Sequence, residues 1–251
     1  MDTTRKFDGR AEDYTAGRPS YAEALIDCMY EKYGLSEASV IADIGSGTGK
    51  FARQLLEKGS EVCCVEPNDD MRCTAEKELV SYTGFRSVKG GAENTTLKTG
   101  SVDAITTAQA FHWFDGAKFR QECSRIIKDG GYVFLIWNVR DMQSPMNKEL
   151  YDIHSGYCPN FRGFSGGMKR DDKRIAEFFD GKYDRVSFDA PLYLDKDKFI
   201  ARCLSGSYSL KDGDNGYDEY MEALLKVFDK YSEDGIVTMA NSSVAYVGKI
   251  K

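Results

Sequence analysis

Short apolar runs alternate with amphipathic stretches along the first half of the chain, and each kind of segment predicts one kind of element. A short, almost wholly apolar run is typical of a strand that is buried on both faces. We expect such strands at 40–44, 62–65, 85–89, 102–107 and 132–137. Apolar residues at helical spacing predict helices at 21–33, 51–58, 69–79 and 117–127. This alternation favours a parallel sheet covered on both faces, and therefore an α/β fold.

The pattern changes after residue 138. Residues 138–170 are rich in glycine, serine, proline, asparagine and aromatic residues, and only one short helix is expected there, at 147–153. A connection of this length inside a compact domain is usually functional. Beyond it, the hydrophobic pattern predicts helices at 171–179, 196–204 and 220–231 and strands at 183–193 and 236–250.

The 251 residues contain no internal repeat, no low-complexity tract and no linker, so a single domain is expected. We divide it into an N-terminal cap segment with its helix at 1–34 and a core at 35–138. An insertion that forms a lid follows at 139–182, and residues 183–251 complete the sheet and add cap helices.

Charge and hydropathy exclude several classes of protein. The chain carries 40 acidic against 34 basic residues, a formal net charge of −6, and no sustained Lys/Arg run, so nucleic acid is a poor partner. The longest strongly apolar run, 132–137, is far shorter than the roughly 20 residues of a membrane span, and the N-terminus lacks the apolar core of a secretion signal. We therefore expect no membrane association.

Cysteine and histidine usage indicates the redox compartment and argues against a metal site. The seven cysteines are odd in number and include no C-x-x-C pair, as is typical of a reduced, cytoplasmic protein. The two histidines, His112 and His154, have no neighbouring residues at metal-ligand spacing, so no metal site is expected.

The most informative motif is the loop Asp43-Ile-Gly-Ser-Gly-Thr-Gly49, which lies between an expected strand and an expected helix. Glycines allow the chain to turn sharply there and allow a ligand to approach the backbone. The following helix presents free N–H groups at its start. Glu66 ends the next strand, where its carboxylate can accept two hydrogen bonds from a ribose diol.

Two kinds of nucleotide ligand are candidates for this loop. A dinucleotide fold has the spacing G-x-G-x-x-G, in which the loop and the helix bind a pyrophosphate. Here the spacing is G-x-G-x-G, and Asp43 precedes the first glycine by two positions. A carboxylate in that place suits a ligand with an ammonium and a sulfonium group better than a pyrophosphate. A P-loop is excluded because its G-x-x-x-x-G-K-[ST] spacing is absent.

These motifs together resemble class I S-adenosylmethionine-dependent methyltransferases. The resemblance comprises the glycine loop, the acidic end of the second strand, GAEN at 91–94 and AQAFHWFD at 108–115. The opening FDGRAEDYTAGRPSY at 7–21 is similar to the methyltransferase type 11 branch, which includes relatives of trans-aconitate methyltransferase. The resemblance implies a Rossmann-like, mostly parallel seven-stranded sheet whose last strand is antiparallel, with a helical cap insertion. It also implies methyl transfer from S-adenosylmethionine to a small-molecule acceptor, with a carboxylic acid favoured.

The resemblance assigns cofactor-binding roles to particular residues. Asp43 and the loop residues Gly45, Ser46, Gly47, Thr48 and Gly49 would hold the methionine part, and Glu66 would bind the ribose. Pro67, Met71, Ala92 and Glu93 would contact the adenine, Gln109 and Ala110 would lie behind the sulfonium, and Arg18 would pair with the methionine carboxylate or with an acidic acceptor. Two of these have an alternative: Met71 fits core packing equally well, and Glu93 fits an exposed loop acid.

The sequence indicates the residues that would bind the methyl acceptor less clearly than those that would bind the cofactor. His112 is the titratable group placed to act as a general base, although a histidine that orders the loop is an equally good interpretation. Tyr14, Tyr21, Trp113 and Phe164 are candidate walls of the acceptor pocket. Two alternative functions stay open: an NAD(P)-dependent oxidoreductase, and a non-catalytic regulatory protein that binds S-adenosylmethionine. The protein is expected to be a monomer or a homodimer.

Overall fold

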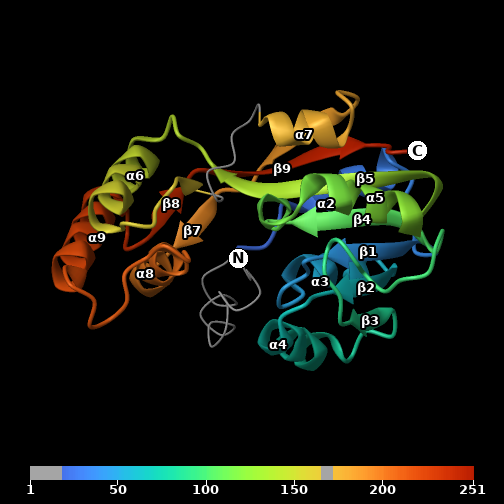
Figure 1. Cartoon of the computed structure of the whole chain (residues 1–251). Coiled ribbons are helices and arrows are strands. Elements are labelled where there is room, and N and C mark those ends of the chain that lie inside the picture. The colour runs from blue at the N-terminus through green and yellow to red at the C-terminus, as the bar shows by residue number, and fades with distance from the viewer. Residues whose placement is uncertain (1–18, 165–171) are drawn as a thin grey trace.

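A seven-stranded sheet forms the centre of the molecule (Figure 1). The computed structural model describes residues 19–164 and 172–251. The strand order is β3-β2-β1-β4-β5-β9-β6. The strands are β1 (Val40–Ile44), β2 (Glu61–Val65), β3 (Phe85–Val88), β4 (Val102–Ala108), β5 (Ile127–Arg140), β6 (Asp184–Asp189) and β9 (Asn241–Gly248).

The pairing of these strands confirms the predicted fold class. Strands β1 to β5 pair in parallel, whereas β9 is antiparallel to both β5 and β6. Because parallel strands end at the same edge of a sheet, the loops that follow β1, β2 and β4 lie together.

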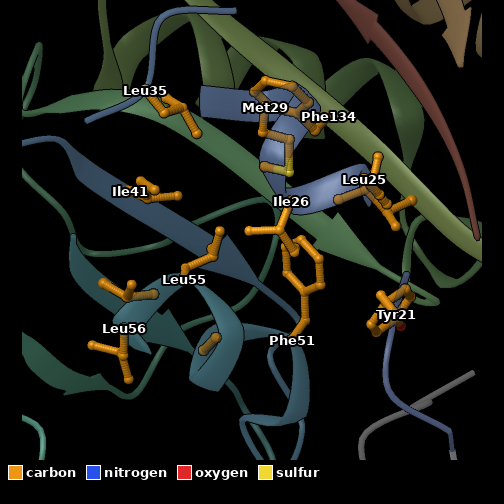
Figure 2. Packing of buried hydrophobic residues seen from close by; sticks show 14 of the residues in the cluster. Tyr21, Leu25, Ile26, Met29, Leu35, Ile41, Phe51, Leu55, Leu56 and Phe134 are labelled. Atoms are coloured by element: carbon orange, nitrogen blue, oxygen red, sulfur yellow. The ribbon is translucent and has the colours of Figure 1, made fainter. Parts of the chain in front are cut away.

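Helices cover both faces of this sheet. One face carries α2 (Glu23–Glu31), α3 (Lys50–Glu57) and α4 (Asp69–Leu79), and the other carries α5 (Gly116–Ile126) and α7 (Lys173–Phe178). Figure 2 shows side chains of α2 and α3 and the sheet pointing toward one another in the first of these two cores. All five of these helices were expected from the hydrophobic spacing, and their ends differ from the expected ones by at most two residues.

Strand β5 is longer than the pattern indicated. It starts at Ile127 and ends at Arg140, so Gly130 and Gly131, which precede the expected strand at 132–137, lie inside a strand. A Cβ on Gly131 would lie 2.5 Å from the carbonyl oxygen of Asp103, so glycine permits the close approach of β5 to β4 at that point. Along β5, Phe134 and Ile136 pack under α2, whereas the alternate residues pack under α5.

A smaller lobe lies at one side of the sheet (Figure 1). It consists of α6 (Pro145–Tyr157), β7 (Leu192–Leu194), α8 (Lys196–Leu204), α9 (Tyr217–Tyr231) and β8 (Val237–Met239), and it has its own apolar core. We call this lobe the cap. The cap contains an antiparallel pair, β7 with β8, in addition to its helices.

The cap corrects three details of the sequence analysis. The single strands expected at 183–193 and 236–250 are each divided, so that one part enters the main sheet and the other enters the cap. Pro191, which has no N–H for a ladder bond, lies at the first division. Helix α6 is also longer than the predicted 147–153, because Ser144 caps its start and Pro145 occupies its first position.

A buried carboxylate fixes the loop that precedes β4. Glu122 on α5 accepts hydrogen bonds from the backbone N and the Oγ1 of Thr95, at 2.7 and 2.6 Å, and from Arg125. The hydrogen bonds from Arg125, followed by those from Thr95, lower the pKa of Glu122 to about 2. The stretch that contains Ala92 and Glu93 is thereby anchored to α5.

We expect Glu122→Gln to reduce the free energy of unfolding by about 2 kcal/mol at pH 7, because bonds to a charged group are lost. A lowered pKa gives stability that is present above the ordinary value and lost as the pH falls toward 2. The difference between variant and wild type should therefore shrink between pH 5 and 2. Urea unfolding followed by circular dichroism measures it. Glu219→Gln, at an exposed site on α9, is the matched control and should be near neutral. A pH-independent difference would contradict the assignment.

Candidate functional site

The loop between β1 and α3 contains three glycines with positive φ, Gly45, Gly47 and Gly49, and they differ in how closely other atoms approach them. A Cβ on Gly45 would lie 2.8 Å from the Cβ of Ala110, and one on Gly49 would lie 2.5 Å from Leu79. A Cβ on Gly47 would meet nothing within 4 Å. The outer glycines therefore allow close packing of the loop, whereas the space above Gly47 is open to a ligand.

Glu66 connects this loop to the end of β2. Its Oε2 accepts a 2.9 Å bond from the N–H of Gly47, and its Oε1 accepts a 2.9 Å bond from the N–H of Asn68. Burial raises the pKa of Glu66, while the two backbone bonds lower it. Each carboxylate oxygen has a second lone pair, so Glu66 holds the loop and can still accept hydrogen bonds from a diol.

Asp43 is almost completely buried at the end of β1. Its Oδ1 accepts a 2.8 Å bond from Thr106 on the neighbouring strand β4. Its Oδ2 has no hydrogen-bond partner among the described residues. Burial raises the pKa of Asp43 to about 7, and the nearby charge of Glu66 adds to this effect. A cationic group beside Oδ2 would stabilise the ionised carboxylate.

A cleft of about 510 Å3, partly open to solvent, lies over the loop. The cleft extends from the glycine loop and the end of β4 to the cap. It is lined by Pro19, Tyr21, Asp43, Gly45, Ser46, Gly47, Thr48, Lys50, Phe51, Ala108, Gln109, Asn138 and Arg202.

Gln109 in this lining has a strained backbone. Its φ is 57°, in the left-handed region that non-glycine residues seldom adopt. A 2.9 Å bond from its N–H to Ile136 and a 3.0 Å bond from its Nε2 to the carbonyl of Asn138 hold it there. Such strain is often found at binding sites.

The residues predicted beside the adenine lie around the ends of β2 and β3. Met71 on α4 and Ala92 are buried, and Pro67 is half-buried. Glu93 accepts a 3.0 Å bond from the N–H of Asp115, so it has a structural role at the start of α5. None of these four is among the residues that line the cleft, and their cofactor contacts stay predictions.

The candidate acceptor residues lie in several places. Tyr21 lines the cleft, whereas His112 and Trp113 lie in the short 3-10 helix η2 (Phe111–Trp113), with ring centroids 4.7 Å apart. Phe164 packs in the cap beneath the guanidinium of Arg140. Tyr14 and Arg18 lie outside the described residues. The catalytic role of His112 stays a prediction.

Several residues of the site were not singled out by the sequence analysis. Thr106 contacts Asp43, and Lys50, Asn138 and Arg202 line the cleft. Asn138 follows directly after the expected strand 132–137, which is a usable signal. Nothing in the sequence indicates that Arg202 of α8 reaches the same cleft, because the position of α8 depends on how the cap packs.

The comparisons with known proteins agree with this geometry. The chain is 34% identical over 152 residues to an uncharacterized methyltransferase of Mycobacterium tuberculosis, a match that covers 61% of this chain and 60% of the relative. A candidate type II methyltransferase structure from Anaeromyxobacter dehalogenans superposes with a TM-score of 0.65 at 19% identity, covering 93% of this chain and 98% of that one.

A second solved structure is an N-methyltransferase of Haemonchus contortus in complex with S-adenosylhomocysteine and phosphomonomethylethanolamine. It superposes with a TM-score of 0.58 at 16% identity and covers 99% of this chain and 60% of that one. At these identities, both structures establish the fold.

The raised pKa of Asp43 generates a prediction about stability. Burial disfavours the ionised carboxylate in the folded protein. The free energy of unfolding therefore declines as the pH rises from about 4 to about 7 and then levels off. We expect Asp43→Asn to be more stable than wild type at pH 8, by up to a few kcal/mol, with a smaller difference at pH 4. Urea unfolding of both proteins at the two pH values measures this. The control is Asp212→Asn in an exposed loop. An Asp43→Asn difference that is equal at both pH values would refute the assignment.

The family model described as a methyltransferase domain matches residues 42–135. This segment contains the glycine loop, Glu66, the GAEN stretch and the residues after β4. Among the described residues, no helix has the length and apolar character of a membrane span, and no cluster of three or more His, Cys, Asp or Glu residues could hold a metal ion. Residues 42–135 match the family described as a methyltransferase domain, and the chain has the α/β fold of solved methyltransferase structures.

Proposed function

We propose that this protein transfers the methyl group of S-adenosylmethionine to a small-molecule acceptor. The observation that carries the proposal is the pair of carboxylates on either side of an open glycine loop. Asp43 offers a cation an oxygen that has no partner among residues 19–164 and 172–251, and Glu66 offers free lone pairs to a diol. S-adenosylmethionine carries an ammonium group, a sulfonium group and a ribose diol. The methyltransferase-domain match over 42–135 supports the same conclusion.

In this proposal, residues at the ends of different strands contact different parts of the cofactor. Asp43 and the loop from Gly45 to Gly49 hold the methionine part, and Glu66 binds the ribose. Pro67, Met71, Ala92 and Glu93 surround the adenine, and Gln109 and Ala110 lie behind the sulfonium. The open space above Gly47 fits this placement, because a side chain there would occupy the position of the ligand.

The bound cofactor supplies a methyl group that is already activated by the positive sulfur. The protein then has to hold the acceptor in line with that methyl group and to exclude water. The cleft between the glycine loop and α8 is the proposed position of the acceptor. No covalent bond between the protein and the methyl group is required.

We favour a carboxylic acid as the acceptor. A carboxylate is already ionised at neutral pH, so its methylation needs no general base. An acceptor hydroxyl or amine would benefit from a base, and His112 is the candidate for that role. Arg202 in the lining of the cleft supports an anionic acceptor.

Ligand-dependent stabilisation tests the choice of cofactor. S-adenosylhomocysteine at about 100 times its Kd should stabilise the protein by about 2.7 kcal/mol, or roughly 5–10 °C for a chain of this size, whereas NADH should have no effect. Glu66→Ala should weaken the binding of S-adenosylhomocysteine by roughly 10- to 100-fold, because two charge-assisted bonds are lost. Glu57→Ala, at an exposed site, is the matched control. Stabilisation by NADH alone would instead indicate an oxidoreductase.

Methyl transfer itself is tested with S-adenosylmethionine that carries a labelled methyl group. We expect label to appear in one or more members of a panel of small carboxylic acids, alcohols and amines, and more readily in the acids. Asp43→Asn should reduce transfer at least tenfold through weaker cofactor binding. Confirmed binding of the cofactor without transfer to any member of a broad panel would favour the non-catalytic regulatory function.

A further inference from the structure

Arg140 is a buried cation that forms no ion pair with the described residues. It ends strand β5, its exposed fraction is 4%, and its Nε and Nη1 have no hydrogen-bond partner among the described residues. Its guanidinium lies 4.1 Å from the ring centroid of Phe164, and no carboxylate of the described residues forms an ion pair with it. Burial of a charge is costly unless an opposite charge and hydrogen bonds compensate for it.

Arg140 lies two residues beyond the part of strand β5 that lines the cleft. Side chains two residues apart in a strand lie on the same face of the sheet, so Arg140 shares a face with Asn138. Asn138 lines the cleft. Arg140 therefore continues the row of side chains that leads from the cleft into the cap.

A second arginine approaches the same region from the cap. Arg202 of α8 lines the cleft. Burial lowers the pKa of His154 to about 3, and the charges of Arg140 and Arg202 both contribute to this shift. The Nδ1 of His154 lies 3.0 Å from the hydroxyl of Tyr220, so the neutral ring belongs to the core of the cap. The ring of Phe164 lies between Arg140 and His154, because its centroid is 4.1 Å from the guanidinium carbon of Arg140 and 5.7 Å from the centroid of the imidazole.

Arg140 lies far along the sheet from Asp43, which is expected to hold the methionine part of the cofactor. Asp43 is in register with Thr106, which is in register with Phe134. Arg140 follows Phe134 by six residues, which corresponds to on the order of 20 Å of extended strand. Arg140 is therefore placed to hold a part of the acceptor rather than the methionine carboxylate that is expected near the glycine loop.

We propose that Arg140, together with Arg202, forms an oxyanion subsite that binds a carboxylate or phosphate group of the acceptor. The fork of N–H donors on a guanidinium matches the oxygens of either group. Phe164 is a positioning residue, because its ring supports the plane of the guanidinium. This subsite rests on the proposed methyl transfer and narrows its substrate to anionic acceptors.

Binding of two probe anions tests the subsite. Inorganic phosphate and citrate are titrated against the protein saturated with S-adenosylhomocysteine, with sodium chloride at matched ionic strength as the reference. Because both anions stabilise proteins nonspecifically, the readout is the difference between variants. The variants are Arg140→Met, Arg202→Met and, as the control at an exposed site on β3, Arg86→Met.

We expect saturable stabilisation of the wild type and of Arg86→Met by at least one anion. Arg140→Met should bind that anion roughly 30-fold more weakly or worse, and Arg202→Met should also be weakened. The comparison of phosphate with citrate identifies which oxyanion the subsite prefers. Without any anion, Arg140→Met should unfold at the same temperature as wild type or above it, because an uncompensated buried charge is removed.

Two results would overturn the subsite: no saturable response of the wild type to either anion, or an equal response of wild type and Arg140→Met. If Arg140→Met does not fold, the anion affinity of Arg202→Met is the test instead. An affinity equal to that of the wild type would then overturn the proposal. The response to S-adenosylhomocysteine is recorded separately. Its absence contradicts the proposed function, whereas its presence without an anion response contradicts only the subsite.

Discussion

The site depends on the parallel pairing of β1 with β2 and β4. Parallel strands end at a common edge, so the residues that follow them meet even when they are far apart in the sequence. Asp43, Glu66 and Gln109 come from three different strands and surround one loop. The bond from Gly47 to Glu66 links two of these strand ends directly, so the loop conformation and the carboxylate position are determined together.

Two buried charged groups make the unliganded protein less stable than its packing alone would allow. Among the described residues, Thr106 donates to one oxygen of Asp43 while the other oxygen has no partner, and Arg140 contacts the ring of Phe164 but no carboxylate. A ligand of opposite charge would stabilise either group. An acidic acceptor and a cationic cofactor would satisfy both, so the binding of both ligands would be coupled to the stability of the fold.

Strand β5 connects the two parts of the molecule. Its middle part, from Val133 to Trp137, lies in the centre of the sheet, packed under α2 on one face and under α5 on the other. Its C-terminal end extends toward the cap (Figure 1). The same strand therefore supports the core beside the glycine loop and carries the side chains that are proposed to bind the acceptor.

The sequence by itself determined the class of the fold and predicted the glycine loop as the centre of the cofactor site. Apolar runs identified the central strands, and glycine spacing together with Asp43 and Glu66 identified the loop, because these features depend on local backbone geometry and on order along the chain. The divided strands at Pro191 and Ala240 required the structure, since hydrophobic alternation does not reveal which sheet a strand enters. The meeting of Arg140 and Arg202 also required it. Those residues are 62 positions apart, and only the packing of the cap against the end of β5 brings their charges near the same buried histidine.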